Sequence, residues 1–380
     1  ADKKDLILFD RKTGKMKNLT EDFDKSVDEF VYSPDSKIIY FTAGNEIYSS
    51  IYKLNVDDEE IELFHKDNYN TSIQPSKSGK TLYFLKQRTD LPAEIFSQST
   101  DGKNTLKRIT FTNEEILSKL EMNPVETFWC EGANGDKVQS ILVKPPFFDP
   151  NKKYPMMFLI HGGPQGAWED NFHYRWNLQM FAGAGYVVVA PNPRGSTGYG
   201  QKFTDEISGD WGGKVYTDLM NSYDYALNNF SYIDPKNTFG SGASYGGYMI
   251  NWIEGHTDKF SALFCHNGTF NLESMWGTTE ELWFPEWDVN GTPWENREAY
   301  VKWSPHQYAK NFKTPMLIVH SAFDFRLSEE QAFQLFTTLQ RLGVESKFLY
   351  FPDETHFVSK PQNAKLWWDT VFDWFKSHQK

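Results

Sequence analysis

One serine of this chain, Ser244, lies in a pattern suited to nucleophilic chemistry, the pentapeptide Gly-Ala-Ser-Tyr-Gly at residues 242–246. A short apolar run, TFGS, leads into the pentapeptide, and the helix-like run YMINWIEG follows it. Between a strand and a helix, the two glycines of Gly-x-Ser-x-Gly allow close passage while the serine occupies a strained turn with its hydroxyl exposed. The pattern therefore predicts that Ser244 is a catalytic nucleophile.

A serine hydroxyl is a weak nucleophile until a histidine, oriented by a carboxylate, removes its proton. In α/β-hydrolases the chain order is serine, acid, histidine, with these residues at strand ends. Asp324 follows the apolar run PMLIVHSAF, and His356 ends the segment KFLYFPDETH. We predict the triad Ser244, Asp324 and His356. Asp353 is the competing acid, which ranks lower because it shares a loop with the histidine.

The glycine-rich turn HGGPQG, residues 161–166, directly follows the apolar run MMFLI. Acyl transfer needs two N–H donors aimed at the developing oxyanion, and a turn of this type after the third strand commonly supplies one. We predict that the backbone N–H groups of Gly163 and Tyr245 are the two donors. His161 is expected to fix the turn rather than act as a base, and a tight strand exit without a catalytic role is the alternative.

From about Phe128, apolar runs alternate with longer helical stretches, which is typical of βαβ units and a mostly parallel sheet. The predicted strands are Met156–Ile160, Tyr186–Ala190, Thr238–Gly240, Ala262–His266, Met316–His320 and Lys347–Phe351. The predicted helices are Tyr216–Asn228, Tyr248–Gly255, Ser328–Leu342 and Ala364–Ser377.

The first 110 or so residues contain a strand–turn–strand element three times, starting at Leu6, Ile51 and Ile95. A repeat of between 40 and 50 residues that consists of short strands has the length of a propeller blade. An unrelated β-meander is the alternative. We predict about two blades of an incomplete propeller over residues 1–120 and an α/β-hydrolase domain over residues 121–380. Because propellers need about 4–8 blades, the remaining blades are expected on a missing or separate chain.

Composition excludes several classes of protein for this chain of 380 residues, of which 39 % are hydrophobic. No run approaches the ~20 apolar residues of a membrane span. A formal charge of −12, with no run of five basic residues, makes nucleic acid a poor partner. The two cysteines, Cys130 and Cys265, cannot build a disulfide framework or a cysteine metal site. No cofactor or metal is predicted.

Six motifs occur in an order that resembles the prolyl oligopeptidase family of serine peptidases: HGGPQG, PNPRGSTGYGQ, GDWGG, GASYGGYM, SAFDFRL and PDETH. Within the family, the stretch from Cys265 to Gly291 most resembles the dipeptidyl-peptidase V and acylaminoacyl-peptidase branch. The resemblance implies a C-terminal α/β-hydrolase domain after an N-terminal β-propeller, and it places the family's triad on Ser244, Asp324 and His356. Branch members are often exported, but the compartment of this chain stays open.

The resemblance also implies that Arg326 contacts the carbonyl of the second substrate residue before the scissile bond, although a structural salt bridge is an alternative role. The pocket for the first residue should be built after the strand that follows Ser244, from Phe270, Met275 and Trp276, with Trp283 and Phe284 as further candidates. Plain core packing is as good an interpretation for any one of them.

We therefore expect a serine peptidase that cleaves short peptides and releases N-terminal dipeptides. An acylaminoacyl peptidase, an oligopeptidase and a carboxylesterase are alternatives, because a triad does not distinguish esters from amides. Peptidases of the fourth dipeptidyl type hold the substrate amine with a pair of propeller glutamates, and the predicted propeller of this chain is incomplete. A homodimer is a further expectation.

Overall fold

The computed structural model describes residues 2–103 and 105–380 and contains two compact units. The first comprises the chain up to Val125 together with residues 167–177 and 196–204. The second comprises Glu126–Gly166, Leu178–Gly195 and Asp205–Lys380. The two later segments that join the first unit lie beyond the predicted boundary at residue 120, which stays a prediction.

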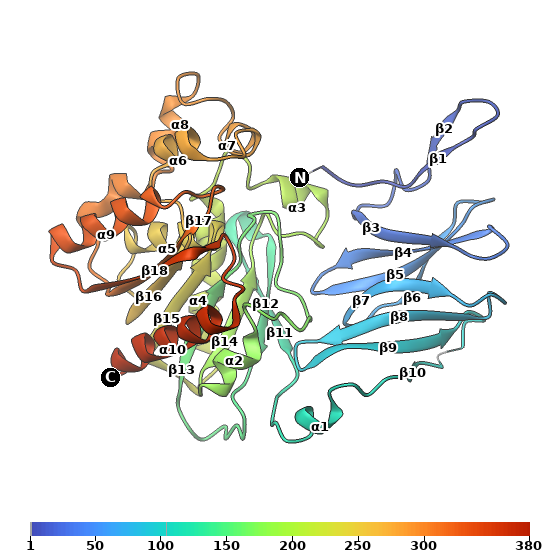
Figure 1. Cartoon of the computed structure of the whole chain (residues 1–380), viewed down its shortest axis with the longest axis horizontal. Coiled ribbons are helices and arrows are strands. Elements are labelled where there is room, and N and C mark those ends of the chain that lie inside the picture. The colour runs from blue at the N-terminus through green and yellow to red at the C-terminus, as the bar shows by residue number, and fades with distance from the viewer. Residues whose placement is uncertain (1, 104) are drawn as a thin grey trace. The chain divides into compact units, whose positions relative to one another are not determined.

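The first unit consists of short antiparallel strands that repeat as the sequence predicted (Figure 1). A hairpin of β1 (Ile7–Phe9) and β2 (Met16–Asn18) comes first. Two four-stranded meanders follow: β3 (Val27–Tyr32), β4 (Ile38–Asn45), β5 (Tyr48–Asn55) and β6 (Ile61–His65), then β7 (Tyr69–Pro75), β8 (Thr81–Arg88), β9 (Leu91–Ser99) and β10 (Lys107–Arg108). A short helix, α1 (Glu114–Leu117), ends this run of elements. The meanders are the blades of a β-propeller region.

Face-to-face packing of the meanders explains why the strands alternate in burial. In β8, Leu82 and Phe84 are buried, whereas Tyr83 between them is exposed. Both buried side chains belong to an apolar cluster that also contains Tyr40 and Ile51 of the first meander. Period-two alternation places such residues on one face of each strand, and the shared cluster joins consecutive blades.

Residues 167–177 and 196–204 are hydrogen-bonded within the first unit. The Asp170 carboxylate accepts from the backbone N–H and hydroxyl of Thr89, at 2.9 and 3.0 Å, and from the side-chain amide of Asn68 at 2.5 Å. The Glu46 backbone N–H donates to the carbonyl of Gly198 at 3.0 Å. These bonds tether two segments that follow the propeller strands in the chain to the loops of the blades.

The second unit is built on an eight-stranded sheet with the order β11-β12-β14-β13-β15-β16-β17-β18. The six strands from β13 to β18 run parallel to one another. At one edge of the sheet, β12 pairs antiparallel with both β11 and β14. The strands are β11 (Glu126–Glu131), β12 (Lys137–Val143), β13 (Tyr154–Ile160), β14 (Val187–Asn192), β15 (Ile233–Ala243), β16 (Ala262–His266), β17 (Met316–Phe323) and β18 (Ser346–Thr355). The six predicted strands are confirmed, and the mostly parallel sheet is that of an α/β-hydrolase.

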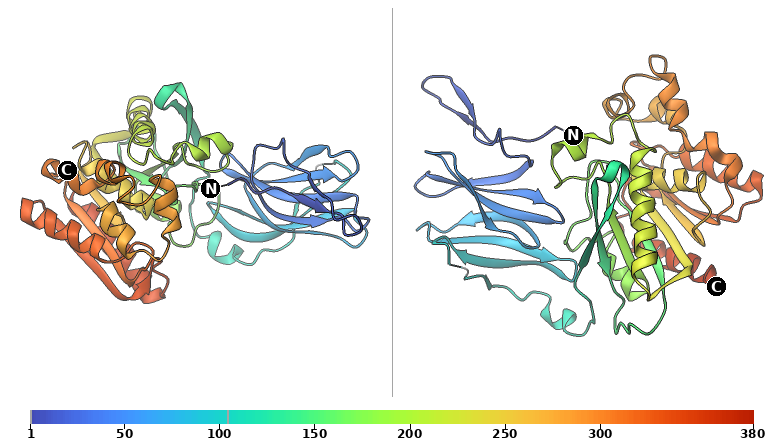
Figure 2. Two further views of the ribbon diagram at one scale, coloured as in Figure 1. Left: turned by 90° about the horizontal axis from the view of Figure 1, so that it is seen from above. Right: turned by 180° about the vertical axis from the view of Figure 1, so that it is seen from behind.

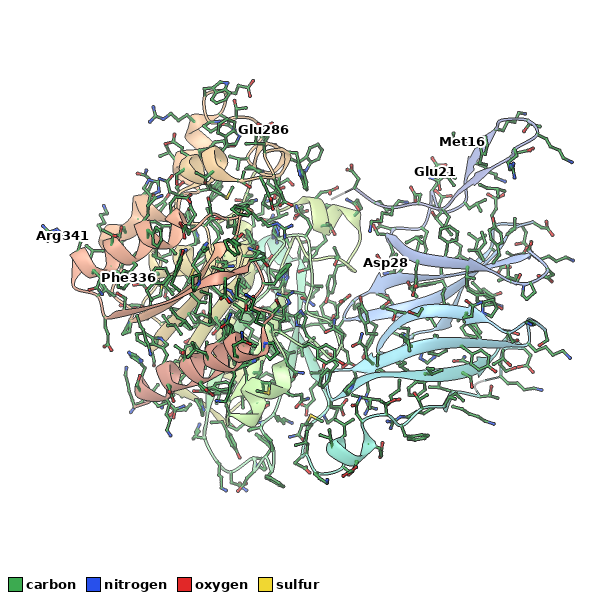
Figure 3. All side chains as sticks on the ribbon, viewed as in Figure 1. Met16, Glu21, Asp28, Glu286, Phe336 and Arg341 are labelled. Atoms are coloured by element: carbon green, nitrogen blue, oxygen red, sulfur yellow. The ribbon has the colours of Figure 1, made fainter. Side chains whose placement is uncertain are left out.

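Helices cover both faces of this sheet (Figures 1 and 2). On one face lie α2 (Leu178–Gly183) and α10 (Pro361–Ser377), where Phe181 packs edge-on against Trp368 at 5.1 Å. On the other lie α4 (Lys214–Asn229), α5 (Tyr245–Glu254) and α9 (Glu330–Leu342). Phe336 of α9, labelled in Figure 3, packs against the large apolar core on this face.

Short helical segments complete the second unit. They are α3 (Gln201–Asp205), which begins in the first unit, η1 (Ala133–Gly135), α6 (Leu272–Thr278), α7 (Trp283–Asp288), α8 (Arg297–Lys302) and η2 (Pro305–Asn311). The last four lie between β16 and β17. Of the helices described in residues 2–103 and 105–380, none combines the length and apolar character that crossing a membrane would require.

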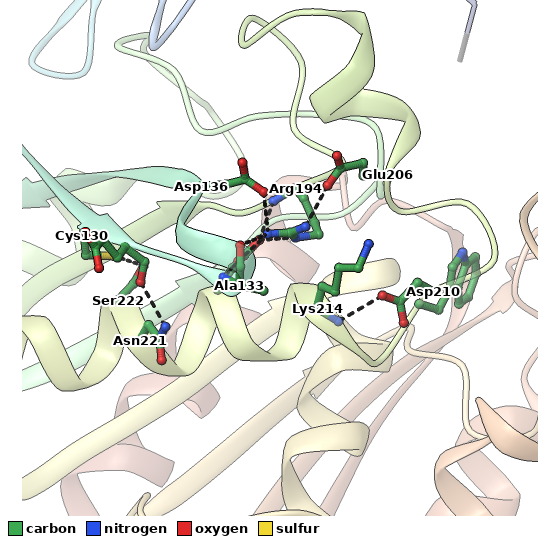
Figure 4. Close-up of polar contacts among 12 residues, drawn as sticks. Cys130, Ala133, Asp136, Arg194, Glu206, Asp210, Lys214, Asn221 and Ser222 are labelled. Atoms are coloured by element: carbon green, nitrogen blue, oxygen red, sulfur yellow. Dashed lines mark hydrogen bonds and ion pairs between the residues drawn. The ribbon is translucent and has the colours of Figure 1, made fainter.

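A buried ion pair fixes the loop after β14 (Figure 4). The Arg194 side chain is fully buried and donates from Nε to Asp218 of α4 at 2.7 Å and from Nη1 to Glu206 at 2.7 Å. Its Nη2 donates to the carbonyl of Ala133 at 2.9 Å. Removal of one partner would leave a buried charge without compensation. Arg194 therefore has a structural role in holding this loop.

Candidate active site

Ser244 lies at a sharp turn between β15 and α5. Its backbone has φ 60° and ψ −122°, a left-handed conformation that residues other than glycine rarely adopt. An added Cβ at Gly242 would overlap the carbonyl oxygen of Gly246, and one at Gly246 would overlap that of Ile160. Close approach of strand and helix therefore requires both glycines, as expected for a nucleophile elbow.

The structure brings Asp324 and His356 together. Nδ1 of His356 lies 2.6 Å from Oδ2 of Asp324. The other oxygen, Oδ1, accepts the backbone N–H groups of Arg326 and Leu327 at 3.1 and 3.0 Å. Asp324 is 1 % exposed, so this carboxylate is held in one orientation by the three contacts.

The three predicted triad residues each come directly after a strand of the same parallel sheet. Ser244 follows β15, Asp324 follows β17 and His356 follows β18. The carboxyl ends of parallel strands meet at one edge of the sheet, where α/β folds place their ligands. This arrangement suits the transfer of a proton from a serine hydroxyl to an imidazole that is oriented by a carboxylate.

The competing acid, Asp353, has different partners. Its carboxylate pairs with Nζ of Lys360 at 2.6 Å and accepts from the Asn363 amide at 3.0 Å. Asp353 is exposed, and Lys360 lowers its pKa chiefly through their hydrogen bond. These contacts favour Asp324 as the acid that orients His356.

The predicted oxyanion turn lies beside Ser244. An added Cβ at Gly162 would come within 3.0 Å of the Ser244 Cβ. Gly163 has φ +132°, a conformation that a residue with a side chain would adopt only under strain. Nδ1 of His161 lies 2.9 Å from the carbonyl oxygen of Gly162, and burial lowers the pKa of His161 to about 4. A neutral, buried imidazole of this kind suits the turn-fixing role.

The second predicted donor, the backbone N–H of Tyr245, opens helix α5. Ser244 is the N-cap of this helix, so the N–H of Tyr245 belongs to the first turn, whose donors lack partners within the helix. The Tyr245 side chain is buried, and its hydroxyl donates to the carbonyl of Trp211 at 2.5 Å. Gly163 and Tyr245 as oxyanion donors stay predictions.

Two buried residues hold the loops that carry Asp324 and His356, and the sequence analysis missed both. Asn267 donates from its side chain to the carbonyl of His356 at 3.1 Å. Nε2 of His320 lies 2.8 Å from the carbonyl of Leu327, within the loop that carries Asp324. Asn267 also begins an Asn-Gly-Thr glycosylation triplet. Its side chain is only 1 % exposed and is therefore inaccessible to glycosylation in the folded chain.

Arg326 forms a two-pronged ion pair with Glu281. Nε lies 2.8 Å from Oε2, and Nη2 donates to Oε1 at 3.0 Å. The Arg326 side chain is 40 % exposed, so the pair contributes little to folding stability. This ion pair is the structural salt bridge that the sequence analysis gave as the alternative role of Arg326. It uses Nε and Nη2 of the guanidinium. Substrate binding by Arg326 stays a prediction.

The predicted pocket residues have unequal surroundings. Phe270 and Met275 are 2 % and 1 % exposed and belong to the large apolar core, which agrees with the alternative of plain core packing. Trp276 is half-buried, and its indole N–H donates to Glu286 of α7, labelled in Figure 3, at 3.1 Å. Trp283 is exposed, whereas Phe284 packs against Trp211. A role in substrate binding stays a prediction for each.

No group of three or more histidine, cysteine, aspartate or glutamate side chains within the described ranges is arranged to hold a metal ion. Both cysteines there are buried free thiols.

The fold and the site define the chain as an α/β-hydrolase with a β-propeller region and a nucleophile elbow. Comparison with known families agrees, because the model of the prolyl oligopeptidase family matches residues 172–380. The chain belongs to the prolyl oligopeptidase family.

Relatives and solved structures extend the likeness over nearly the whole chain. The probable dipeptidyl-peptidase 5 of Arthroderma benhamiae is 41 % identical over 94 % of this chain and 50 % of its own length. Dipeptidyl-peptidase 5 of Schizosaccharomyces pombe is 36 % identical over 100 % of this chain and 56 % of its own. An acylaminoacyl peptidase of Pyrococcus horikoshii superposes with a TM-score of 0.87 at 27 % identity, covering 98 % of this chain and 58 % of that structure. The chain thus spans about half the length of the curated relatives it matches.

Proposed function

We propose that the chain is a serine peptidase that cleaves short peptides through an acyl-enzyme. The observation that carries the proposal is the 2.6 Å contact between His356 and Asp324, on loops that share a sheet edge with the Ser244 elbow. Ser244 attacks the scissile carbonyl, while His356 accepts the hydroxyl proton and returns it to the leaving amine. Water then releases the acyl group by the same route, with Asp324 holding the imidazole tautomer throughout.

The backbone N–H groups of Gly163 and Tyr245 stabilise the negative oxygen of each tetrahedral intermediate in this proposal. The nearness of Gly162 to Ser244 and the position of Tyr245 in the first turn of α5 support these assignments. Donors that point at the oxyanion are worth about 10²–10³ in kcat each. Arg326 holds the carbonyl of the preceding substrate residue, and Phe270, Met275 and Trp276 line the pocket for the residue at the scissile bond.

For the substrate, we propose peptides with a free amino end, from which dipeptides are released. The names of the curated relatives support this choice, and the acylaminoacyl peptidase of similar fold supports the alternative of an N-acylated substrate. A carboxylesterase is a third candidate, since the triad also accepts esters.

We further propose that additional blades complete the propeller. Two meanders are fewer than the ~4–8 blades of a closed ring, and the relatives are about twice as long as the region they share with this chain. Produced alone, residues 6–110 should aggregate or remain poorly folded because their strand edges are unpaired. A homodimer stays a prediction.

A panel of chromogenic substrates tests the proposed activity. It contains a dipeptidyl p-nitroanilide with a free amino end, the same compound N-acetylated, an N-acetyl-aminoacyl p-nitroanilide and a short p-nitrophenyl ester. We expect the free dipeptide to react fastest and acetylation to reduce its hydrolysis strongly. Preference for the N-acetyl-aminoacyl compound would assign an acylaminoacyl peptidase, and hydrolysis of the ester alone would assign an esterase.

A further inference from the structure

Asp288, the last residue of α7, carries a carboxylate that is buried among neutral donors. Oδ1 accepts from the Ser208 hydroxyl at 3.0 Å and from the Gln165 side-chain amide at 3.3 Å, and Oδ2 accepts from the Trp211 indole N–H at 3.1 Å. Its backbone carbonyl also accepts the N–H of Gly209 at 2.8 Å. Asp288 is only 1 % exposed.

Folding alone gives little reason to place a carboxylate there. Burial raises the pKa of Asp288, although hydrogen bonds from Ser208, Trp211 and Gln165 oppose the rise. A buried acid whose hydrogen bonds come from neutral donors costs free energy relative to a well-packed apolar residue. The donors come from two segments far apart in the sequence, Gln165 and the loop from Ser208 to Trp211, so the benefit must lie in holding these two segments together.

Both segments lead to the proposed oxyanion donors. Gln165 belongs to the turn HGGPQG, two residues after Gly163. The carbonyl of Trp211 accepts the Tyr245 hydroxyl at 2.5 Å, and the rings of Trp211 and Tyr245 meet edge-on at 5.2 Å. One carboxylate thus connects to Gly163 through Gln165 and to Tyr245 through Trp211.

We propose that Asp288 is a positioning residue for the oxyanion hole, which sets the spacing of the Gly163 and Tyr245 backbone N–H groups by holding Gln165 and Trp211. This inference rests on the proposed function. Asp288 does not touch the reacting atoms in this role and acts only through the two residues it binds. Ser208 and Gly209 add two bonds that hold the loop before Trp211.

The proposal predicts a loss specific to the tetrahedral state. Displacement of a catalytic group by about 1 Å can cost roughly 10² in rate, so Asp288→Asn should lower kcat about 10–100-fold. The amide cannot accept from all three donors, because one of its two polar atoms is itself a donor. KM should change less than about threefold, since ground-state contacts are retained.

The test compares kcat, KM and the inhibition constant of a dipeptidyl boronate, which forms a tetrahedral adduct on Ser244. For Asp288→Asn in the full chain, we expect the boronate affinity to fall by the same factor as kcat. Tyr245→Phe, which removes only the hydroxyl bound to Trp211, should give the same pattern. This second variant keeps the test decisive if Asp288→Asn fails to fold.

Glu254→Gln is the matched control. Glu254 is a carboxyl in the same unit with 2 % exposure, accepts the backbone N–H groups of Lys313 and Thr314, and lies at the other end of α5 from Tyr245. This variant should retain kcat and boronate affinity.

Distinct results would overturn distinct claims. Unchanged kcat and boronate affinity in both Asp288→Asn and Tyr245→Phe would overturn the role of Asp288, as would equal losses in Glu254→Gln. A parallel rise in KM and loss of kcat would also overturn it, because that pattern indicates a general loss of site structure. A wild-type chain that shows no hydrolysis and no fluorophosphonate labelling of Ser244 would instead overturn the proposed function.

Discussion

Replacement of Asp324 by asparagine should nearly abolish activity while leaving the fold intact. The substitution keeps the shape of a side chain that is 1 % exposed and changes one of its two oxygens into an amide nitrogen. In the wild-type chain, Oδ1 accepts two backbone N–H groups and Oδ2 faces Nδ1 of His356. The consequence depends on which of these positions the new NH₂ group occupies.

The hydrogen bonds decide the orientation of the asparagine. If the NH₂ group faced the backbone N–H groups of Arg326 and Leu327, two buried donors would lose their acceptor, at about 1–3 kcal/mol each. The amide oxygen should therefore stay at the Oδ1 position, and the NH₂ group should point at Nδ1 of His356. Nδ1 must then accept this hydrogen bond, so the neutral imidazole carries its proton on Nε2 and cannot remove the proton of Ser244.

The expected magnitude is a loss of about 10⁴ in kcat, as for a triad with the wrong imidazole tautomer. This factor corresponds to roughly 5.5 kcal/mol of transition-state stabilisation. The assay is steady-state hydrolysis of the best substrate of the panel, together with the rate of fluorophosphonate labelling. Thermal unfolding of the variant should stay within a few degrees of the wild type, because the packing and both backbone bonds are retained.

Asp353→Asn is the matched control, since Asp353 lies three residues before His356 and is bound to Lys360. It should lower kcat less than about threefold. The reasoning is refuted if Asp324→Asn retains kcat within tenfold of the wild type. A larger loss in Asp353→Asn than in Asp324→Asn would make Asp353 the triad acid.

Three further predictions concern the nucleophile, the substrate contact and the pH dependence of stability. Ser244→Ala should lower kcat by about 10⁶ and abolish fluorophosphonate labelling, and persistent labelling of another serine would contradict the assignment. Arg326→Ala should lower kcat/KM for peptides about 10–150-fold, as for a charged hydrogen bond, with little change for an acetate ester. Glu281→Gln, which removes only the ion pair, should retain peptide activity, and equal losses in both variants would assign Arg326 to structure. Burial raises the pKa of Glu254 from 4.5 to about 7, so this group favours the folded state below pH 4.5 and loses that contribution as pH rises through 7. Glu254→Gln should therefore flatten the fall in unfolding free energy between pH 4.5 and 7 by about 3 kcal/mol, measured by urea unfolding.

Local patterns in the sequence were sufficient to predict most of the fold. The blade repeats and the six parallel strands have a clear hydrophobic period, and each is present in the structure. The antiparallel pair β11 and β12 was missed, although Phe128 and Cys130 alternate with exposed residues in β11. Helix α5 begins at Tyr245, three residues before its predicted start, because Gly246 and Gly247 hide its apolar period.

Some residues of the site could be predicted from the local sequence, whereas others depend on contacts between distant parts of the chain. Ser244, Asp324 and His356 could be predicted from the sequence because each directly follows an apolar strand. Asn267, His320 and Asp288 gave no such signal, since the hydrogen bonds on which their proposed roles depend form only in the fold. Asp288 contacts Gln165 across 123 residues of sequence. Residue type could not show that Phe270 and Met275 are almost fully buried, because burial depends on the whole fold.

The two halves of the proposed machinery are held by different means, and this determines how they should respond to mutation. Ser244, Asp324 and His356 follow strands of one sheet, so backbone pairing fixes their spacing and the loss of a neighbouring side chain should change it little. Gly163 and Tyr245 follow the paired strands β13 and β15, but each lies three residues beyond the register pair of Ile160 and Gly242. In our proposal, side-chain hydrogen bonds through Gln165, Trp211 and Asp288 complete the positioning of these two N–H groups. Substitutions outside the reacting groups should therefore affect the stabilisation of the tetrahedral intermediate before they affect the activation of the serine.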